Sequence, residues 1–332
     1  MLSKLSHKEL IKLAGKSCVP PLSPKFHKGQ SGGRVCIVGG CEDYTGAPFF
    51  SAHATALMGC DLTHVICEKN AATVIKSYSP NLMVHPYLRD NGSKSEMDKI
   101  KSLLQRIHVT VIGPGLGRDD SMLNAVKEII RYILEEHEGD IPIVIDADGL
   151  YLVCQDKEVR DMLKKFPVGR IILTPNVVEF KRICDALTGG KADEIDGNKR
   201  MGAFIANELK CIVVQKGTSD QIFSPANASS MLVNSQEGSN KRVGGQGDTL
   251  TGCIACMLAY SRAMYDFKLC GDPHQDKKDD KLQWVDYAML SCYAGCTITR
   301  ECARLAFKAT GRAMQTTDLN NRVGEVFNKI FP

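Results

Sequence analysis

The run Gly244-Gly-Gln-Gly-Asp248 combines glycines with one carboxylate and lies shortly before an apolar segment with helical periodicity, residues 253–260. A glycine-rich turn that opens a helix directs several backbone N–H groups and the positive end of the helix dipole toward one point, where an anion such as phosphate is stabilised. Asp248 could cap the helix as its N-cap residue, or it could accept a proton from a hydroxyl that attacks phosphorus. Because a cap does not require glycines, and each glycine costs conformational entropy, we favour the proton acceptor.

A second glycine-rich run, Gly113-Pro-Gly-Leu-Gly117-Arg118, follows a predicted strand at 109–112. It does not match the dinucleotide fingerprint G-x-G-x-x-G, because Arg118 occupies the position of the last glycine. The run is either a ligand-binding loop at the carboxyl end of a parallel strand or a purely structural turn.

Polar residues also follow three other predicted strands. Asn176 and Glu179 lie three residues apart on one face of a predicted helix, where they could orient Mg²⁺-bound water or a ribose, or form an ordinary solvated first turn. Lys216 opens the turn Lys-Gly-Thr-Ser-Asp220, where it could meet a phosphate as a point charge or serve the turn alone. Asp146 and Asp148 could bind a metal or form an Asx-type turn.

The elements that must position these residues are predicted from apolar runs. Helical segments such as 121–134 separate the first six predicted strands, and this alternation indicates a parallel sheet covered on both faces. Two further strands are expected to be antiparallel at the far edge, and the chain after residue 249 is expected to be mainly helical, with long helices at 250–260 and 284–307. Residues 268–281 are predicted to form a surface loop. The eight predicted strands are 34–38, 62–67, 109–112, 141–145, 170–173, 211–215, 220–223 and 230–233.

The 332 residues include 42 basic and 38 acidic side chains, a balance without the charge footprint of a nucleic-acid binder. The 14 cysteines lie in apolar runs, so we expect reduced, buried thiols around the site rather than in it, and we read Cys253-x-x-Cys256 as packing. Apolar stretches are too short for a membrane span.

Residues 1–26 are predicted to be a docking segment with a short basic amphipathic helix. Glu9 follows Ser6 at the spacing of a capping box. An uninterrupted apolar signal core is missing, and the first arginine is Arg34, so a cytoplasmic location is favoured over a mitochondrial one. Residues 27–332 are expected to form a single domain, and a homo-oligomer is compatible with the sequence.

Read in order, the motifs resemble those of the nucleotide-dependent NAD(P)H-hydrate dehydratases, a family of the ribokinase-like superfamily. The forms Asn176-Val-Val-Glu-Phe180 and Gly244–Gly252 resemble the eukaryotic branch, which uses ATP. Cys41 and Cys60 stand where serine and alanine would be expected. The matching segments are His27-Lys-Gly, Gly39-Gly40 with Tyr44–Pro48, Ser79-Pro80, Gly113–Gly117, Asp146–Gly149, Leu173–Phe180, Gly244–Asp248 and Gly311–Asp318.

The resemblance implies a ribokinase-like three-layer α/β/α fold with a central mostly parallel sheet, antiparallel edge strands and a helical C-terminal part. It implies a lyase that dehydrates hydrated NADH and NADPH by phosphorylating the ring hydroxyl with ATP and eliminating phosphate. The C-6 (S) epimer would be the substrate, and because 26 residues before His27 cannot hold an epimerase domain, any epimerase partner would be a separate protein. The alternatives are a ribokinase-like small-molecule kinase, a dehydrogenase and a silent nucleotide-binding protein.

By the same resemblance, Asp248 accepts the hydroxyl proton while the amides of Gly245, Gln246 and Gly247 stabilise the transferring phosphoryl group. Mg²⁺ would be bound through the ATP phosphates, without protein ligands apart from a water-mediated contact to Glu179. The residues expected to hold the hydrated cofactor are Gly117, Asn176, Val177, Val178, Glu179, Phe180, Lys181, Arg182 and Asp248. The residues expected to hold ATP are Lys216, Gly217, Thr218, Ser219, Asp220, Gly238, Ser239, Asn240, Lys241, Arg242, Val243, Gly244, Gly245, Gln246 and Gly247.

Overall fold

A computed structural model describes residues 2–88, 94–195, 197–225, 231–271 and 282–332. Among these residues, nine strands form one sheet in the order β3-β2-β1-β4-β5-β6-β7-β8-β9. Strands β1 to β7 pair in parallel, whereas β8 and β9 are antiparallel at one edge. The strands are β1 Arg34–Val38, β2 Leu62–Glu68, β3 Met83–Leu88, β4 Val109–Ile112, β5 Ile143–Ile145, β6 Ile171–Leu173, β7 Ile212–Gln215, β8 Asp220–Phe223 and β9 Leu232–Asn234.

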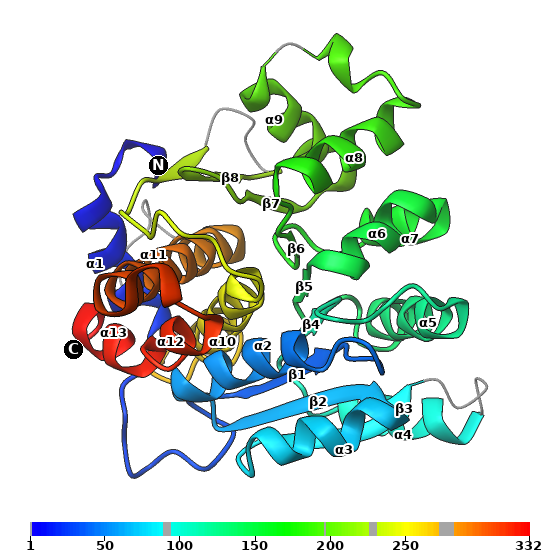
Figure 1. Cartoon of the computed structure of the whole chain (residues 1–332), viewed down its shortest axis with the longest axis horizontal. Helices are drawn as coiled ribbons and strands as arrows, with labels where there is room; N and C mark the ends of the chain where they lie inside the picture. The colour runs from blue at the N-terminus through cyan, green and yellow to red at the C-terminus, as the bar shows by residue number, and fades with distance from the viewer. Residues whose placement is uncertain (1, 89–93, 196, 226–230, 272–281) are drawn as a thin grey trace.

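Helices cover both faces of this sheet, and each face has its own hydrophobic core (Figure 1). The inner strands β1, β4 and β5 are buried on both sides, which explains why they consist almost entirely of branched apolar residues. One face carries α1 His7–Cys18, α2 Gly46–Leu57, α3 Lys69–Tyr78, α10 Gln246–Tyr265, α11 Trp284–Thr310, α12 Thr316–Asn320 and α13 Val323–Ile330. The other carries α4 Lys94–Leu104, α5 Asp120–Glu136, α6 Ala147–Gln155, α7 Lys157–Leu163, α8 Val177–Thr188 and α9 Asn198–Leu209. Short 3-10 turns lie at Leu2–Lys4, Ala192–Glu194 and Gly311–Ala313.

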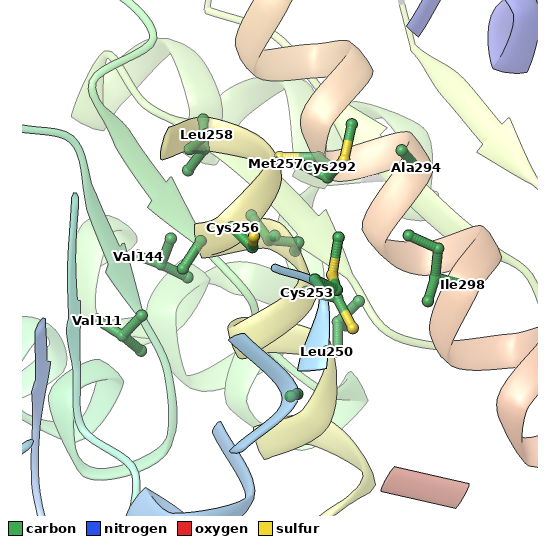
Figure 2. Packing of buried hydrophobic residues seen from close by; sticks show 14 of the residues in the cluster. Val111, Val144, Leu250, Cys253, Cys256, Met257, Leu258, Cys292, Ala294 and Ile298 are labelled. Atoms are coloured by element: carbon green, nitrogen blue, oxygen red, sulfur yellow. The ribbon is translucent and has the colours of Figure 1, made fainter. Parts of the chain in front are cut away.

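Helix α10 is the buried centre of the first face. Its side chains pack between the sheet residues Val111 and Val144 and helix α11 (Figure 2). A Cβ atom at Gly252 would lie 2.1 Å from the carbonyl oxygen of Ser51 in α2, so the glycine is required for the close approach of the two helices. This packing fixes the direction in which the N-terminus of α10 points.

The mostly parallel sheet with an antiparallel edge confirms the architecture predicted from the sequence. Strand β3 was not predicted, because Met83–Leu88 contains Pro86 and polar residues; a proline without a donor N–H is tolerated at a sheet edge, and β3 lies there. Helix α10 begins four residues before its predicted start. The loop predicted at 268–281 falls partly outside the described residues, since 272–281 are not described, and the same holds for residue 230 of the last predicted strand.

The N-terminal helix α1 begins with the predicted capping box. The Ser6 hydroxyl accepts from the backbone N–H of Glu9, and the Glu9 carboxylate accepts from the backbone N–H of Ser6 at 2.8 Å. Leu10, Ala14 and Cys18 place the apolar face of α1 in the same core as α10 and α11. In the described part of the chain, no helix is both long and apolar enough to cross a membrane.

Candidate active site

Charged side chains converge at the carboxyl edge of the sheet. Asp146 follows β5 and Lys216 follows β7, while Glu179 and Asp248 belong to the first turns of α8 and α10. The Lys216 ammonium lies 2.7 Å from Oδ1 of Asp146, whose side chain is 3% exposed. The strands are parallel, so their carboxyl ends meet at one edge, and residues distant in sequence form one ionic cluster.

The glycine turn at the start of α10 lies against this ion pair. A Cβ atom at Gly247 would be 3.2 Å from Nζ of Lys216 and 3.5 Å from Oδ2 of Asp146. The N-cap is Gly245, which has a left-handed backbone (φ 94°) and offers no side chain, so the described structure shows no side-chain cap on this helix terminus. Asp248 is the third residue of the helix, and the alternative that it serves as the N-cap is therefore wrong.

Burial, together with the negative charge of Asp146, raises the pKa of Asp248 to about 7 against the opposing charge of Lys216. Burial by itself would lower the pKa of Lys216, but the carboxylates of Asp146 and Glu179 outweigh it, so the pKa is raised and the ammonium stays charged. A carboxyl group that titrates near neutral pH can both accept and release a proton under working conditions.

Asn176 and Glu179 form a reciprocal capping box at the start of α8. Oδ1 of Asn176 accepts from the N–H groups of Val178 (2.9 Å) and Glu179 (3.0 Å), and Oε2 of Glu179 accepts from the N–H of Asn176 (2.8 Å). Asn176 and Glu179 therefore have a structural role in the first turn of α8, one of the two alternatives that the sequence left open. Burial also raises the pKa of Glu179, which faces Lys216 and Asp146.

Cavities lie on both sides of the residues Gly247 and Asp248. Asp248 lines a cavity of about 600 Å³ together with Gly117, Arg118 and Asp148. Gly247 lines another of about 670 Å³, together with Lys216. A group bound in one cavity and a group bound in the other would meet at the N-terminus of α10. This arrangement suits transfer of an anionic group between two ligands.

The chain is similar to known proteins along its whole length. A model of the NAD(P)H-hydrate dehydratase family matches residues 35–300. The chain is 72% identical to the ATP-dependent (S)-NAD(P)H-hydrate dehydratase of Saccharomyces cerevisiae, over the full length of both proteins. The chain belongs to the NAD(P)H-hydrate dehydratase family. It is also 42% identical to the mouse (Mus musculus) protein of the same name, over 95% of this chain and 84% of the mouse protein.

Solved structures agree with the ribokinase-like fold expected for this family. A ribokinase-like superfamily protein from Enterococcus faecalis matches with a TM-score of 0.70 and 21% identity, over 99% of this chain and 96% of that chain. The ADP/ATP-dependent NAD(P)H-hydrate dehydratase of Bacillus subtilis, co-crystallized with ATP/Mg²⁺, matches with a TM-score of 0.68 and 22% identity, over 98% and 97%. At these identities the likeness concerns the fold.

Most residues that the family resemblance assigns to ATP gather around one cavity. Gly245 and Lys241 instead contact the C-terminal segment: a Cβ atom at Gly245 would lie 2.8 Å from Cγ2 of Thr316, and the Lys241 ammonium donates to the carbonyl of Met314 at 2.8 Å. Ser219 and Gly244 likewise do not line the cavity that contains Lys216. The lining residues among those assigned are Lys216, Gly217, Thr218, Asp220, Gly238, Ser239, Asn240, Arg242, Val243, Gln246 and Gly247.

The residues assigned to the hydrated cofactor are more dispersed. Gly117 and Asp248 line the 600 Å³ cavity, and Glu179 and Arg182 line an adjoining cavity of about 510 Å³. Asn176 lines the cavity that also contains Lys216. The side chains of Val177 and Val178 are exposed, that of Phe180 is buried in the core, and that of Lys181 pairs with Asp193.

The expectation that the cysteines lie around the site and not in it is wrong for three of them. Cys41, Cys154 and Cys296 each line one of these cavities. Cys41 does so because it follows β1 at the carboxyl edge of the sheet, where the ligand cavities open. Burial raises the pKa of Cys154 to about 11, so its thiol stays protonated at neutral pH.

Sequence reasoning also missed contacts that shape the site. Asp148 accepts from the backbone N–H of Gly117 (3.0 Å) and from the Arg118 side chain (3.1 Å), and so connects the glycine run to the first turn of α6. Ala147, between the two aspartates, has a left-handed backbone (φ 46°), which is strained for a residue with a Cβ atom. Only the glycines of the run and the aspartate pair gave a signal for these contacts.

Proposed function

We propose that this protein converts the (S) epimer of hydrated NADH or NADPH into NADH or NADPH, with ATP converted into ADP and phosphate. The observation that carries the proposal is the position of Asp248, a half-buried carboxyl at a helix N-terminus that lines one cavity while the preceding residue, Gly247, lines another. The name shared by the yeast, mouse and other relatives favours this reaction over that of a small-molecule kinase.

The chemical difficulty is that hydroxide is a poor leaving group. Asp248 takes the proton of the ring hydroxyl while the hydroxyl oxygen bonds to the γ-phosphorus of ATP. The bond between the γ-phosphorus and the oxygen that bridges the β- and γ-phosphates breaks, which gives ADP. The ring nitrogen lone pair then expels phosphate from the neighbouring carbon, and loss of a proton from the next carbon restores the dihydronicotinamide. One hydrate and one ATP give one reduced cofactor, ADP, phosphate and a proton.

The remaining groups of the cluster stabilise charge. The first-turn N–H groups of α10 and the Lys216 ammonium would face the transferring phosphoryl group, and Asp146 keeps this ammonium in place. We place the nucleotide in the cavity lined by Lys216 and Gly247, and the hydrated ring in the cavity lined by Gly117 and Asp248.

We also propose that Mg²⁺ enters with the nucleotide. The described residues contain no cluster of three or more His, Cys, Asp or Glu side chains able to hold an ion, while the carboxylate of Glu179 near Lys216 supplies the oxygen chemistry that a hydrated Mg²⁺ favours. When bound, the ion would neutralise phosphate charge. The carboxylate of Glu179 would add a water-mediated contact to an ion that the ATP phosphates coordinate.

Two biological expectations accompany the proposal. Because the curated relatives are named for the (S) epimer, we infer that a separate epimerase supplies it from the other epimer. We propose a cytoplasmic location, supported by the capped, acid-containing first helix and by the lack of arginine before Arg34, features unlike those of a mitochondrial presequence.

The test is a coupled measurement of absorbance and phosphate. Purified protein with hydrated NADH and Mg·ATP should restore dihydronicotinamide absorbance in step with phosphate release, one for one. ATP consumption with a stable phosphorylated product and no absorbance gain would support the kinase instead. Absence of ATP consumption would indicate a nucleotide-binding protein without catalytic activity.

A further inference from the structure

Arg300, in the middle of α11, directs its whole guanidinium group at the wall of the nucleotide cavity. Nε and Nη2 donate to the two carboxylate oxygens of Asp220 at 2.6 and 2.9 Å. Nη2 also donates to the carbonyl of Gly217 (2.8 Å), and Nη1 donates to the carbonyls of Thr218 (2.9 Å) and Gln236 (3.3 Å). One planar group thus contacts four residues of two chain segments.

Both segments line the cavity that contains Lys216 and Gly247. Gly217 and Thr218 belong to the turn between β7 and β8, and Asp220 is the first residue of β8. Gln236 belongs to the segment that follows β9. A Cβ atom at Gly238, on the second segment, would lie 3.8 Å from the Arg300 stem.

The ion pair between Arg300 and Asp220 is largely shielded from water. The side chains of Arg300 and Asp220 are 13% and 8% exposed, so their forked ion pair is mostly removed from solvent. The carbonyls of Gly217 and Thr218 point toward the guanidinium, and the N–H groups of the same trans peptide planes, those of Thr218 and Ser219, therefore point away from it. Arg300 sets the orientation of the peptides that follow Lys216.

We propose that Arg300 is a positioning residue that holds the β7–β8 turn and the segment after β9 at the spacing needed to bind ATP. The inference rests on the proposed use of ATP in this cavity. Arg300 acts through Gly217, Thr218, Asp220 and Gln236, so its loss weakens ATP binding while the other cavity keeps its shape.

Arg304 provides a matched control on the same helix. It lies about one turn after Arg300, and its Nε forms an ion pair of 2.7 Å with Glu301 outside the nucleotide cavity. Glu301 also accepts from the Gln236 amide at 3.1 Å and keeps this bond when Arg304 is replaced. Substituting Arg304 therefore removes an arginine from α11 and leaves the contacts of Arg300 with both segments in place.

The experiment titrates Mg·ATP into the wild type, R300M, R300K and R304M by calorimetry in the absence of hydrated cofactor, alongside steady-state kinetics. R300M removes all five of these hydrogen bonds, so its Kd for ATP should rise at least about tenfold. Its KM for ATP should rise with it, and its KM for hydrated NADH should stay within about twofold. R304M should match the wild type.

R300K distinguishes the loss of the Arg300 hydrogen bonds from a general loss of the fold. Lysine keeps the charge opposite Asp220 but lacks the planar fork, so R300K should remain folded and still bind ATP several-fold more weakly than the wild type. Wild-type ATP affinity in folded R300K and R300M would overturn the inference, as would an equal rise in both KM values. A wild-type protein that binds no ATP would instead overturn the proposed function.

Discussion

The ammonium of Lys216 lies 2.7 Å from the carboxylate of Asp146, and this buried pair lies directly against Gly247 in the first turn of α10. A flexible lysine held in this way presents a fixed positive charge beside the backbone N–H groups of the turn. The same Asp146 places a negative charge near Asp248 and contributes to its raised pKa. One carboxylate therefore orients the cation and makes the proton acceptor more basic.

Replacing Asp146 with asparagine should affect both roles. In D146N we expect kcat to fall about 10- to 100-fold, because Lys216 loses its fixed position, and the acidic limb of the kcat profile should move to lower pH as a negative charge near Asp248 disappears. Steady-state rates between pH 5 and 9 measure both effects. An acidic limb at its wild-type pH would mean that Asp146 does not influence the proton acceptor.

Replacing Asp248 with asparagine removes the proton acceptor and leaves the shape of the site nearly unchanged. D248N should lose at least about 100-fold in kcat, since general base catalysis typically contributes this much. ATP affinity should stay within about threefold. Single-turnover assays together with ATP titration separate the two effects, and near-normal turnover would show that another group takes the proton.

The wild-type rate should depend on ionised Asp248. Its pKa is raised to about 7, so below that pH kcat should fall about tenfold per pH unit, while above pH 8 it should level off. The profile of D248N at its residual rate is the control, and this limb should be missing from it. A wild-type rate that stays flat down to pH 5 contradicts the assignment.

The raised pKa also carries a cost in stability. Because the folded pKa of Asp248 exceeds its unfolded value, the folded state binds the proton more tightly, and stability from this group is present at low pH and lost as pH rises toward about 7. D248N should therefore unfold at a temperature a few degrees higher than the wild type at pH 8, with little difference near pH 4. Scanning calorimetry at both values measures this, and an equal shift at both would point to a cause other than ionisation.

The contact between α2 and α10 should be intolerant of added volume. In Gly252→Ala the new methyl group would meet the Ser51 carbonyl, so we expect a loss of about 2–3 kcal/mol in unfolding free energy from overpacking. Gly244→Ala is the matched control, because a Cβ there meets nothing within 4 Å. Chemical denaturation compares the two variants, and equal stability would show that the helices can separate without cost.

The sequence predicted most of the sheet because its inner strands are continuous apolar runs, a local signal. It missed β3, where Pro86 interrupts the pattern at the sheet edge. It identified Lys216, Asp146 and Asp248 as polar groups at element ends, but their pairing joins positions far apart in the chain and follows from strand order alone. Arg300 lies inside a helix without any motif, so only the folded contacts distinguish it from a surface arginine.

Some expectations remain predictions. The roles of Val177, Val178 and Phe180 toward a ligand come from resemblance, and their side chains lie outside the cavities described. The division of the chain at residue 27 likewise stays a prediction, although α1 shares the core of α10 and α11.

Buried cysteine thiols between α10 and α11 allow the opening of this interface to be measured by chemical labelling. Cys253 of α10 and Cys292 of α11 are buried, and burial raises the pKa of each thiol, to about 12 for Cys253. Alkylation requires an exposed thiolate, so each can be labelled when the two helices separate. These native cysteines therefore report the local separation of α10 and α11. Comparing their alkylation rates with and without nucleotide would show by how much ligand binding suppresses this separation.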